Sequence, residues 1–234
     1  MTVSQASSPM HPLDHPIWNA LTTRQQTLAE GGALARRYPP AIAPFAAMAD
    51  MSAQSFAALG ALMTGSDVVV LFTPDPVNAP AELKVLLAET GEQMIGTPAE
   101  SSIGGAEIIT LGAEDAAAMV ELTKLTNPGP FTLRTQELGT FLGIRIDGQL
   151  VAMAGERMKP VKYTEITAVC VHPNHRGRGY GQMLLAAISR RIAARGEIPF
   201  LHVFSSNSSA IALYQRQGME IRRRLYVTVL ARNV

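Results

Sequence analysis

The sequence predicts a mixed α/β fold in which a central sheet carries helices on both faces. Strand-like and helix-like segments alternate along the C-terminal half, and a glycine-rich loop joins an apolar strand to an amphipathic helix. An Asp-Gly pair between two alternating apolar runs adds a hairpin. Apolar residues form 47% and charged residues 17% of the 234 residues, a composition typical of a folded domain rather than of disorder.

The segments of the C-terminal half follow in a regular order. Glycines at 196 and 218 end two of the expected helices. We expect strands at 108–111, 141–146, 150–157, 163–171, 200–204 and 225–230, and helices at 113–126, 178–195 and 208–217. Strand, helix, hairpin, strand, helix, strand, helix, strand is the order that places helices on both faces of one mixed sheet.

The N-terminal half gives weaker signals. Residues up to about Met63 are helix-biased, residues 68–72 predict a buried strand, residues 82–89 a short helix and residues 93–95 a further strand. The segment 96–105 is rich in Gly, Ser and Pro, so we expect a domain boundary there. Residues 1–105 then form an α/β region, either a degenerate second copy of the C-terminal fold or a substrate domain, and residues 106–234 form the main domain.

Charge and cysteine usage limit the function classes. The chain has 20 basic and 19 acidic residues, which gives no reason to expect nucleic acid or a membrane as partner. Cys170 is the only cysteine, which fits a reducing compartment. Residues 1–12 lack the basic and apolar regions of a signal peptide, so we expect a cytoplasmic protein. Prolines beside His11 and His15 oppose a helical metal site, and we expect no metal.

The glycine-rich loop, VHPNHRGRGYG at residues 171–181, predicts an anion site. Gly177, Gly179 and Gly181 allow a tight backbone that exposes several N–H groups, and the start of the following helix adds its dipole. Arg176 and Arg178 offer charge-assisted contacts to phosphate oxygens. The loop meets neither the G-x-G-x-x-G pattern of dinucleotide sites nor the Gly-Lys-Ser/Thr of a P-loop. These features favour a pyrophosphate as ligand.

Three motifs carry a resemblance to a known family. Arg176, Gly179 and Gly181 meet the pattern R-x-x-G-x-G, which resembles the pyrophosphate loop of the GNAT superfamily of acyl-CoA N-acyltransferases. The upstream EITAVCVHP, residues 165–173, is similar to the fourth strand of that superfamily. The downstream NSSAIALYQRQGM, residues 207–219, resembles its second cofactor motif. The resemblance covers roughly residues 107–232, a little over half of the chain.

The resemblance implies a fold, a co-substrate and a set of contacts. The sheet should be mostly antiparallel and splayed between its fourth and fifth strands. Acetyl-CoA should lie in the splay, with its pantetheine arm bonded to the backbone of Val169 and Val171 like an added strand. The other implied cofactor contacts come from the loop and from the second motif, namely Arg176, Gly177, Arg178, Gly179, Tyr180, Gly181 and Asn207.

The resemblance also implies acid–base roles. Tyr214 matches the tyrosine that protonates the departing thiolate, although it could simply pack the end of its helix. Glu165 is the candidate base or else a solvated strand residue. It stands four residues before Val169, so we expect both on one sheet face. Asn207 contacts the pantetheine, caps its helix, or does both.

Other polar residues carry weaker expectations. Cys170 should face away from Glu165 as a buried thiol rather than a nucleophile. Arg134 could bind an acceptor carboxylate, but pairing with Glu137 three residues later is favoured. The run Arg222-Arg223-Arg224 should be a solvated edge.

The expected function is transfer of acetyl from acetyl-CoA directly to an amine through a ternary complex. The alternatives are a non-catalytic acyl-CoA sensor and an acyltransferase for a longer acyl group. The acceptor stays open between a small amine, an amino acid, an antibiotic and a protein N-terminus. A homodimer would be consistent with the superfamily.

Overall fold

The computed structural model describes residues 11–96 and 105–233. Most of the expected boundary segment, and of the stretch judged for a signal peptide, lies outside the described residues. The α-helices are α1 (Pro16–Thr22), α2 (Ala53–Leu62), α3 (Ala116–Thr126), α4 (Tyr180–Ala194) and α5 (Ser208–Arg216). The strands are β1 (Glu30–Gly31), β2 (Ala35–Arg37), β3 (Ala46–Met48), β4 (Val68–Thr73), β5 (Leu83–Ile95), β6 (Ile109–Leu111), β7 (Phe141–Ile146), β8 (Gln149–Glu156), β9 (Tyr163–Val171), β10 (Ile198–Phe204) and β11 (Glu220–Arg232).

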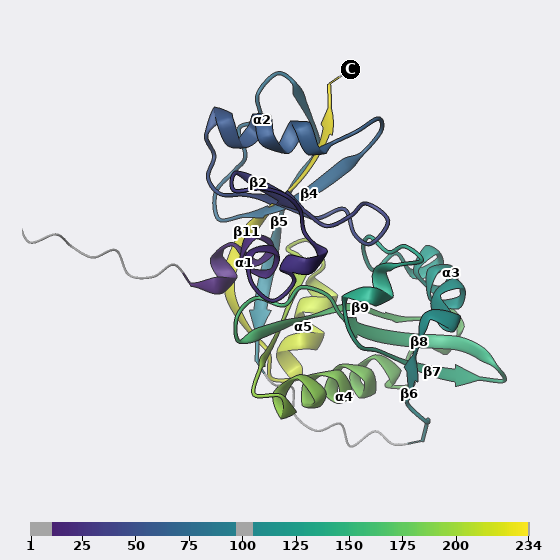
Figure 1. The fold of residues 1–234 in the computed structure, drawn as a ribbon. Coiled ribbons are helices and arrows are strands. Elements are labelled where there is room, and N and C mark those ends of the chain that lie inside the picture. Colours follow the sequence, from purple (N-terminus) through teal and green to yellow (C-terminus); the bar gives the residue numbers. More distant parts are fainter. Residues whose placement is uncertain (1–10, 97–104, 234) are drawn as a thin grey trace, which may run out of the picture.

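One large sheet organises the molecule. Its eight strands have the order β4-β11-β5-β10-β9-β8-β7-β6, and β1, β2 and β3 form a small second sheet. Every neighbouring pair in the large sheet is antiparallel except β9 with β10. The predicted mixed, mostly antiparallel sheet with helices on both faces is confirmed, and Figure 1 shows α3 and α4 on different sides of β8 and β9.

The C-terminal half has the predicted order of elements. The hairpin of β7 and β8 turns at Asp147 and Gly148, whose φ angles of 50° and 80° suit the Asp-Gly pair. Gly196 and Gly218 follow α4 and α5 with φ angles of 74° and 91°, as expected of glycines that end helices. Local turn chemistry and hydrophobic periodicity therefore fix this half from its sequence.

The helix predicted at residues 82–89 is wrong, because these residues belong to the 13-residue strand β5. This strand lies between β10 and β11, and its pairing with β11 runs from Leu83↔Arg232 to Ile95↔Glu220. Such pairing overrides the helix propensity of the Lys, Leu, Ala and Glu residues in its first half. The predicted regions 1–105 and 106–234 are thus separate in sequence but share one sheet.

The helix-biased N-terminal stretch also holds more than helices. The helices α1 and α2 occupy part of it, and the three short strands of the second sheet lie between them. Leu13, Ile17 and Leu21, at and before α1, pack with Phe200 and Leu225 of the large sheet in one buried cluster. This N-terminal segment therefore covers the sheet face opposite α4.

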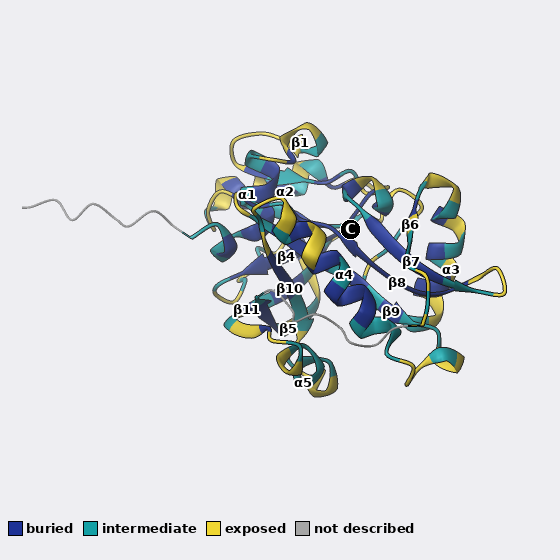
Figure 2. Ribbon diagram, turned by 90° about the horizontal axis from the view of Figure 1, so that it is seen from below, coloured by how far each residue is buried: buried dark blue, intermediate teal, exposed yellow. Residues whose placement is uncertain are grey.

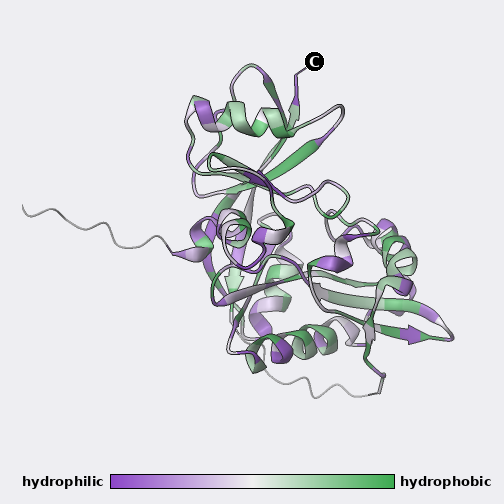
Figure 3. Cartoon of the chain, in the orientation of Figure 1, coloured by the Kyte–Doolittle hydropathy of each residue, from purple (hydrophilic) through white to green (hydrophobic). Residues whose placement is uncertain are grey.

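The helix α4 is the main cover of the other face. Its buried side turns Leu184, Leu185, Ile188 and Ile192 onto β7, β8 and β9, so one wide stripe is dark blue in Figure 2. Its remaining surface is polar, and the helix carries both colours in Figure 3. Each of these side chains contributes roughly 1.5–3 kcal/mol by burial. This packing fixes the start of α4, where the glycine loop enters.

Candidate acyl-CoA site

The strands β9 and β10 pair at one end and part at the other. Their parallel pairing runs from Tyr163↔Ile198 to Glu165↔Phe200. Beyond that point β9 continues to Val171 and β10 to Phe204 without further pairing between them. The predicted splay between the fourth and fifth strands of the C-terminal half is therefore present, and it begins after Glu165.

A β-bulge lies directly after the splay begins. On β8 the partners Gly155 and Met153 are two residues apart, but their partners on β9, Thr167 and Cys170, are three apart. Ala168, within the bulge, has a φ of 52°, which is a strained conformation for a residue with a Cβ. One extra residue reverses the alternation of side chains along the strand.

The bulge overturns two expectations about sheet faces. Ile166 and Val169 both pack into the cluster beneath α4, so Glu165 points away from them, and its predicted common face with Val169 is wrong. Cys170 packs with Ala168 and the α3 residues on the opposite face. Cys170 therefore lies on the side of Glu165, contrary to the prediction, although it is a buried thiol as expected.

The backbone of Val169 and Val171 faces the splay. Glu165 exchanges both backbone bonds with the β8 side, to Met158 O at 2.8 Å and from Arg157 N at 3.0 Å, and His172 N donates to Val151 O at 2.8 Å. With the bulge counted, alternation turns the N–H and C=O groups of Val169 and Val171 to the other edge. No described strand pairs with that edge, so it suits an extended ligand.

The glycine loop adopts the conformation that its sequence predicts. Gly177 and Gly179 have φ angles of 76° and 79°, and a side chain at Gly177 would project into open space. The first backbone bond into α4 runs from Met183 N to Gly179 O at 3.0 Å. The N–H groups of Tyr180 and Gly181 come before that bond and are among the donors that every helix start leaves unsatisfied. The loop therefore suits a phosphate ligand.

Side chains around the loop add charge and shape. Arg176 and Arg178 are exposed, and Arg176 Nε makes a long contact of 3.5 Å with Val171 O. Tyr180 is half-buried against the α4 cluster. A Cβ at Gly181 would meet only Val171 Cγ2, at 3.6 Å. Because glycine has no side chain, this position leaves space for a ligand beside the splay. The predicted loop residues thus gather at the open end of the splay.

Tyr214 lies on α5, half-buried in the same cluster as Val169 and Val171. Burial raises its pKa to about 12, with a smaller contribution from Cys170. The phenol therefore keeps its proton across the physiological range and can donate a hydrogen bond to a sulfur that gains negative charge. Packing and a catalytic role are compatible for this residue.

Asn207 stands at the start of α5. Its side-chain oxygen accepts a hydrogen bond from Ala210 N at 3.2 Å, so it is the N-cap of the helix. Capping, one of the two expected roles, is therefore present. The side chain lies at the end of β10, beside the open end of the splay.

Glu165 occupies a different setting from either alternative. Its side chain is fully buried, and Arg157 bonds both carboxylate oxygens, at 2.8 and 2.7 Å. Burial alone would raise the pKa of Glu165, but the charge and hydrogen bonds of Arg157, together with the bond from His202, lower it to about 2. A solvated glutamate is excluded, and a carboxylate with this pKa is a weak base.

Two further expectations about charged residues have clear outcomes. Arg134 pairs with Glu137 at 2.6 and 2.9 Å, as favoured. The edge expected at residues 222–224 is wrong, because β11 lies between β4 and β5, and these partly exposed arginines form ion pairs with Asp14 and Glu92. Sequence spacing could not reveal those partners, since they lie more than a hundred residues away.

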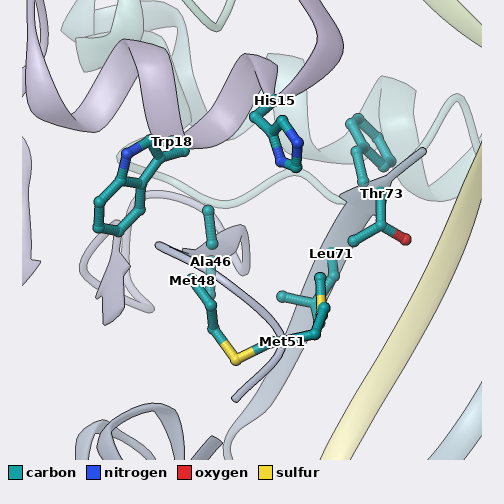
Figure 4. A pocket seen from close by; sticks show the side chains of 9 residues that line it. His15, Trp18, Ala46, Met48, Met51, Leu71 and Thr73 are labelled. Carbon is teal, nitrogen blue, oxygen red and sulfur yellow. The ribbon is translucent and has the colours of Figure 1, made fainter. Parts of the chain in front are cut away.

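Two pockets lie away from this site. The one in Figure 4, lined by residues around α1, β3 and β4, holds about 10 Å³ and has room for no more than one water molecule. A groove of about 800 Å³ lies between α2 and the ends of β5 and β11. Neither contains a residue of the glycine loop. Within residues 11–96 and 105–233, no cluster of His, Cys, Asp and Glu is arranged to hold a metal.

No helix in the described part of the chain combines the length and apolar character needed to cross a bilayer. A sheet split between β9 and β10, with a glycine-rich loop at its open end, is the arrangement expected of an acyl-CoA-dependent acyltransferase. Comparison with known proteins agrees, since the family model of FR47-like protein matches residues 141–227.

Relatives extend the match to most of the chain. The N-alpha-acetyltransferase RimI of Mycobacterium tuberculosis is 33% identical over 138 residues, which are 51% of this chain and 85% of the relative. A GNAT-family protein from Novosphingobium aromaticivorans is 39% identical, with 96% of this chain and 100% of that chain covered and a TM-score of 0.89. The chain belongs to the GNAT superfamily of N-acetyltransferases.

A more distant structure shares the fold alone. The GCN5-related N-acetyltransferase from Kribbella flavida is 17% identical, with 94% of this chain and 96% of that chain covered and a TM-score of 0.61. Because 94% of this chain is covered, the fold of most of its N-terminal half recurs in that structure.

Proposed function

We propose that the protein transfers the acetyl group of acetyl-CoA directly to an amine within a ternary complex. The observation that carries the proposal is the unpaired edge of β9 beyond Glu165, which ends at the glycine loop. A pantetheine arm needs an extended backbone partner, and a pyrophosphate needs clustered N–H donors. Both kinds of partner adjoin at Val171. A single, buried cysteine supports action in a reducing compartment such as the cytoplasm.

Each group has a part in the proposed reaction. The loop and the arginines Arg176 and Arg178 hold the pyrophosphate, and the backbone of Val169 and Val171 holds the pantetheine. The amine attacks the thioester carbonyl carbon, so a C–N bond forms as the C–S bond breaks. Tyr214 donates a proton, or a hydrogen bond, to the departing thiolate. The amine must lose a proton, and the low pKa of Glu165 weighs against that residue as the acceptor.

The acceptor class is a finer proposal. The relative from Mycobacterium tuberculosis is named an N-alpha-acetyltransferase, which supports the N-terminal amine of a peptide or protein as one acceptor. Small amines remain the other class. Mass spectrometry of products, with a panel of N-terminal peptides, small amines and acyl-CoAs of different length, separates these acceptors and also tests the preference for acetyl.

Calorimetric titration with acetyl-CoA tests the cofactor site. Gly177 and Gly196 are matched, because both have positive φ, 76° and 74°, and neither would bring a Cβ within 4 Å of a neighbour. Gly177→Trp should abolish micromolar binding by filling the space that a phosphate needs, while Gly196→Trp, at the far end of α4, should keep it. Failure of the wild-type protein to bind acetyl-CoA would refute the proposal.

A further inference from the structure

A series of hydrogen-bonded, buried polar side chains runs from strand to strand where β9 and β10 part. Arg157 holds Glu165 by two hydrogen bonds, and Glu165 Oε1 lies 2.7 Å from His202 Nδ1. On its other side His202 Nε2 lies 3.1 Å from Gln93 Nε2, on β5. The side chains of Glu165 and His202 are 0% and 6% exposed, so these bonds are shielded from water.

This series of hydrogen bonds continues from Gln93 to the N-terminal segment. Gln93 Nε2 donates to Leu13 O at 2.9 Å, and Gln93 Oε1 accepts from Arg222 Nη1 at 2.8 Å. Arg222 also pairs with Asp14 at 2.6 Å. Because Gln93 presents its NH₂ group to the ring, His202 Nε2 accepts and His202 Nδ1 carries the proton that is donated to Glu165. With this assignment, Glu165, His202 and Gln93 each have hydrogen-bond partners.

The hydrogen bond of His202 links β9 and β10 at the point where the two strands part. Glu165 and Phe200 are the last backbone partners of β9 and β10, and His202 is two residues further along β10. The bond from His202 to Glu165 therefore joins the two strands directly past their last backbone pair. Arg157, directly after β8, and Gln93, on β5, hold the two ends of that bond. Buried charge–dipole bonds of this kind resist displacement because breaking one leaves a buried charge without its partner.

We propose that His202 is a positioning residue which, through Glu165, holds the base of the splay at the width that the thioester end of acyl-CoA requires. The inference rests on the proposed function, because it assumes that acyl-CoA enters the splay. It gives Glu165 a role other than that of general base. The glycine loop lies at the opposite, open end, so nucleotide recognition does not depend on this bond.

Calorimetry with two ligands tests the inference without knowledge of the acceptor. Acetyl-CoA fills both the loop and the splay, whereas adenosine 3′,5′-bisphosphate, the nucleotide end of coenzyme A, reaches only the loop. His202→Leu should raise the Kd of acetyl-CoA about tenfold, since one hydrogen bond to a charged group is lost. The Kd of adenosine bisphosphate should not change. His202→Asn should restore acetyl-CoA affinity, because its amide N–H can replace Nδ1–H.

His15→Leu is the matched control, since this histidine is half-buried at the small pocket of Figure 4, away from the splay, and should leave both affinities unchanged. Unchanged acetyl-CoA binding in His202→Leu, or equal weakening of both ligands, would overturn the inference. So would an Asn variant as weak as the Leu variant. A wild-type protein that binds neither ligand would instead defeat the proposed function itself.

Discussion

The two ends of β9 differ in what holds them. The first end, Tyr163 to Glu165, pairs with β10, and Glu165 bonds to the backbone of Arg157 and Met158 just past β8 and to buried side chains. The second end, Ile166 to Val171, pairs with β8, but no strand among the described residues pairs with its other edge. The bulge at Ala168 lies within the second end. One strand thus combines a rigid support with an edge left open for a ligand.

This difference teaches how a split sheet can remain stable. An unpaired edge inside a sheet exposes backbone N–H and C=O groups, which could pair with the neighbouring strand or shift the register of the strands. Here the charged and polar groups of the rigid end pair with one another where the strands part, and the bulge lies directly beyond that point. The following variants test that division of labour, in order of expected effect.

Arg157→Met tests the rigid end most severely. It leaves the buried carboxylate of Glu165 without its cationic partner, and the free energy of unfolding should fall by about 3–5 kcal/mol. Arg134→Met is the control, since Arg134 and Glu137 form an exposed pair that water screens, and its loss should leave the free energy of unfolding nearly unchanged. Urea denaturation of both variants measures the contrast, and equal losses would contradict a special role for the buried pair.

Acid should weaken the rigid end as well. The pKa of Glu165 is lowered from 4.5 to about 2 in the folded protein, so its contribution is present above pH 4.5 and is lost as pH falls towards 2. The expected loss is about 3 kcal/mol, at 1.4 kcal/mol for each pKa unit. Urea unfolding at a series of pH values measures it. In the double variant Arg157→Met, Glu165→Leu the free energy of unfolding should depend less on pH between 4.5 and 2. An unchanged dependence on pH would contradict the role of Glu165 in this loss of stability.

Tyr214→Phe tests chemistry beside the open end. Loss of the phenol proton should lower kcat about a hundredfold, the lower end of typical general-acid effects, while the Kd of acetyl-CoA stays within about twofold. Tyr226→Phe, at a half-buried tyrosine on β11, serves as the control and should change neither. Steady-state kinetics with an amine identified by product screening provides the comparison. An unaltered kcat in Tyr214→Phe would remove this residue from the mechanism.

Asn207→Ala should have the smallest effect. Loss of an N-cap costs about 1 kcal/mol of unfolding free energy. Ser52→Ala at α2 is closely matched, because Ser52 Oγ accepts from Ser55 N at the same 3.2 Å. Both variants should lose similar stability in thermal denaturation, but only Asn207→Ala should also weaken acetyl-CoA binding. If Asn207→Ala and Ser52→Ala bind acetyl-CoA with equal affinity, Asn207 acts as a helix cap only.

The sequence predicted the C-terminal elements and the loop because their signals are local. Gly177, Gly179 and the Asp147-Gly148 turn each announce their backbone conformation within a few residues. The end of β5 was predicted as a strand at residues 93–95, but its first part was missed because its stability comes from pairing with a strand more than a hundred residues later in the chain. Local propensity cannot report such a partner.

The site was predicted less completely than the fold. The loop residues meet at the open end of the splay as expected, but Glu165 was placed on the wrong face because the bulge at Ala168 leaves no mark in the sequence. Arg157, His202 and Gln93 were not singled out at all. An inward histidine in the apolar run Phe200–Phe204 was the one available signal, and only its contacts reveal a purpose.

Amide hydrogen exchange at Val169 and Val171 is the most direct test of the central claim, that the open edge of β9 receives the pantetheine arm. Coenzyme A should slow exchange of these two amides, whereas adenosine 3′,5′-bisphosphate should not, because it lacks that arm. Amides of β8, such as Val151, serve as the internal reference. Unchanged exchange at Val169 and Val171 in protein saturated with coenzyme A would contradict the account.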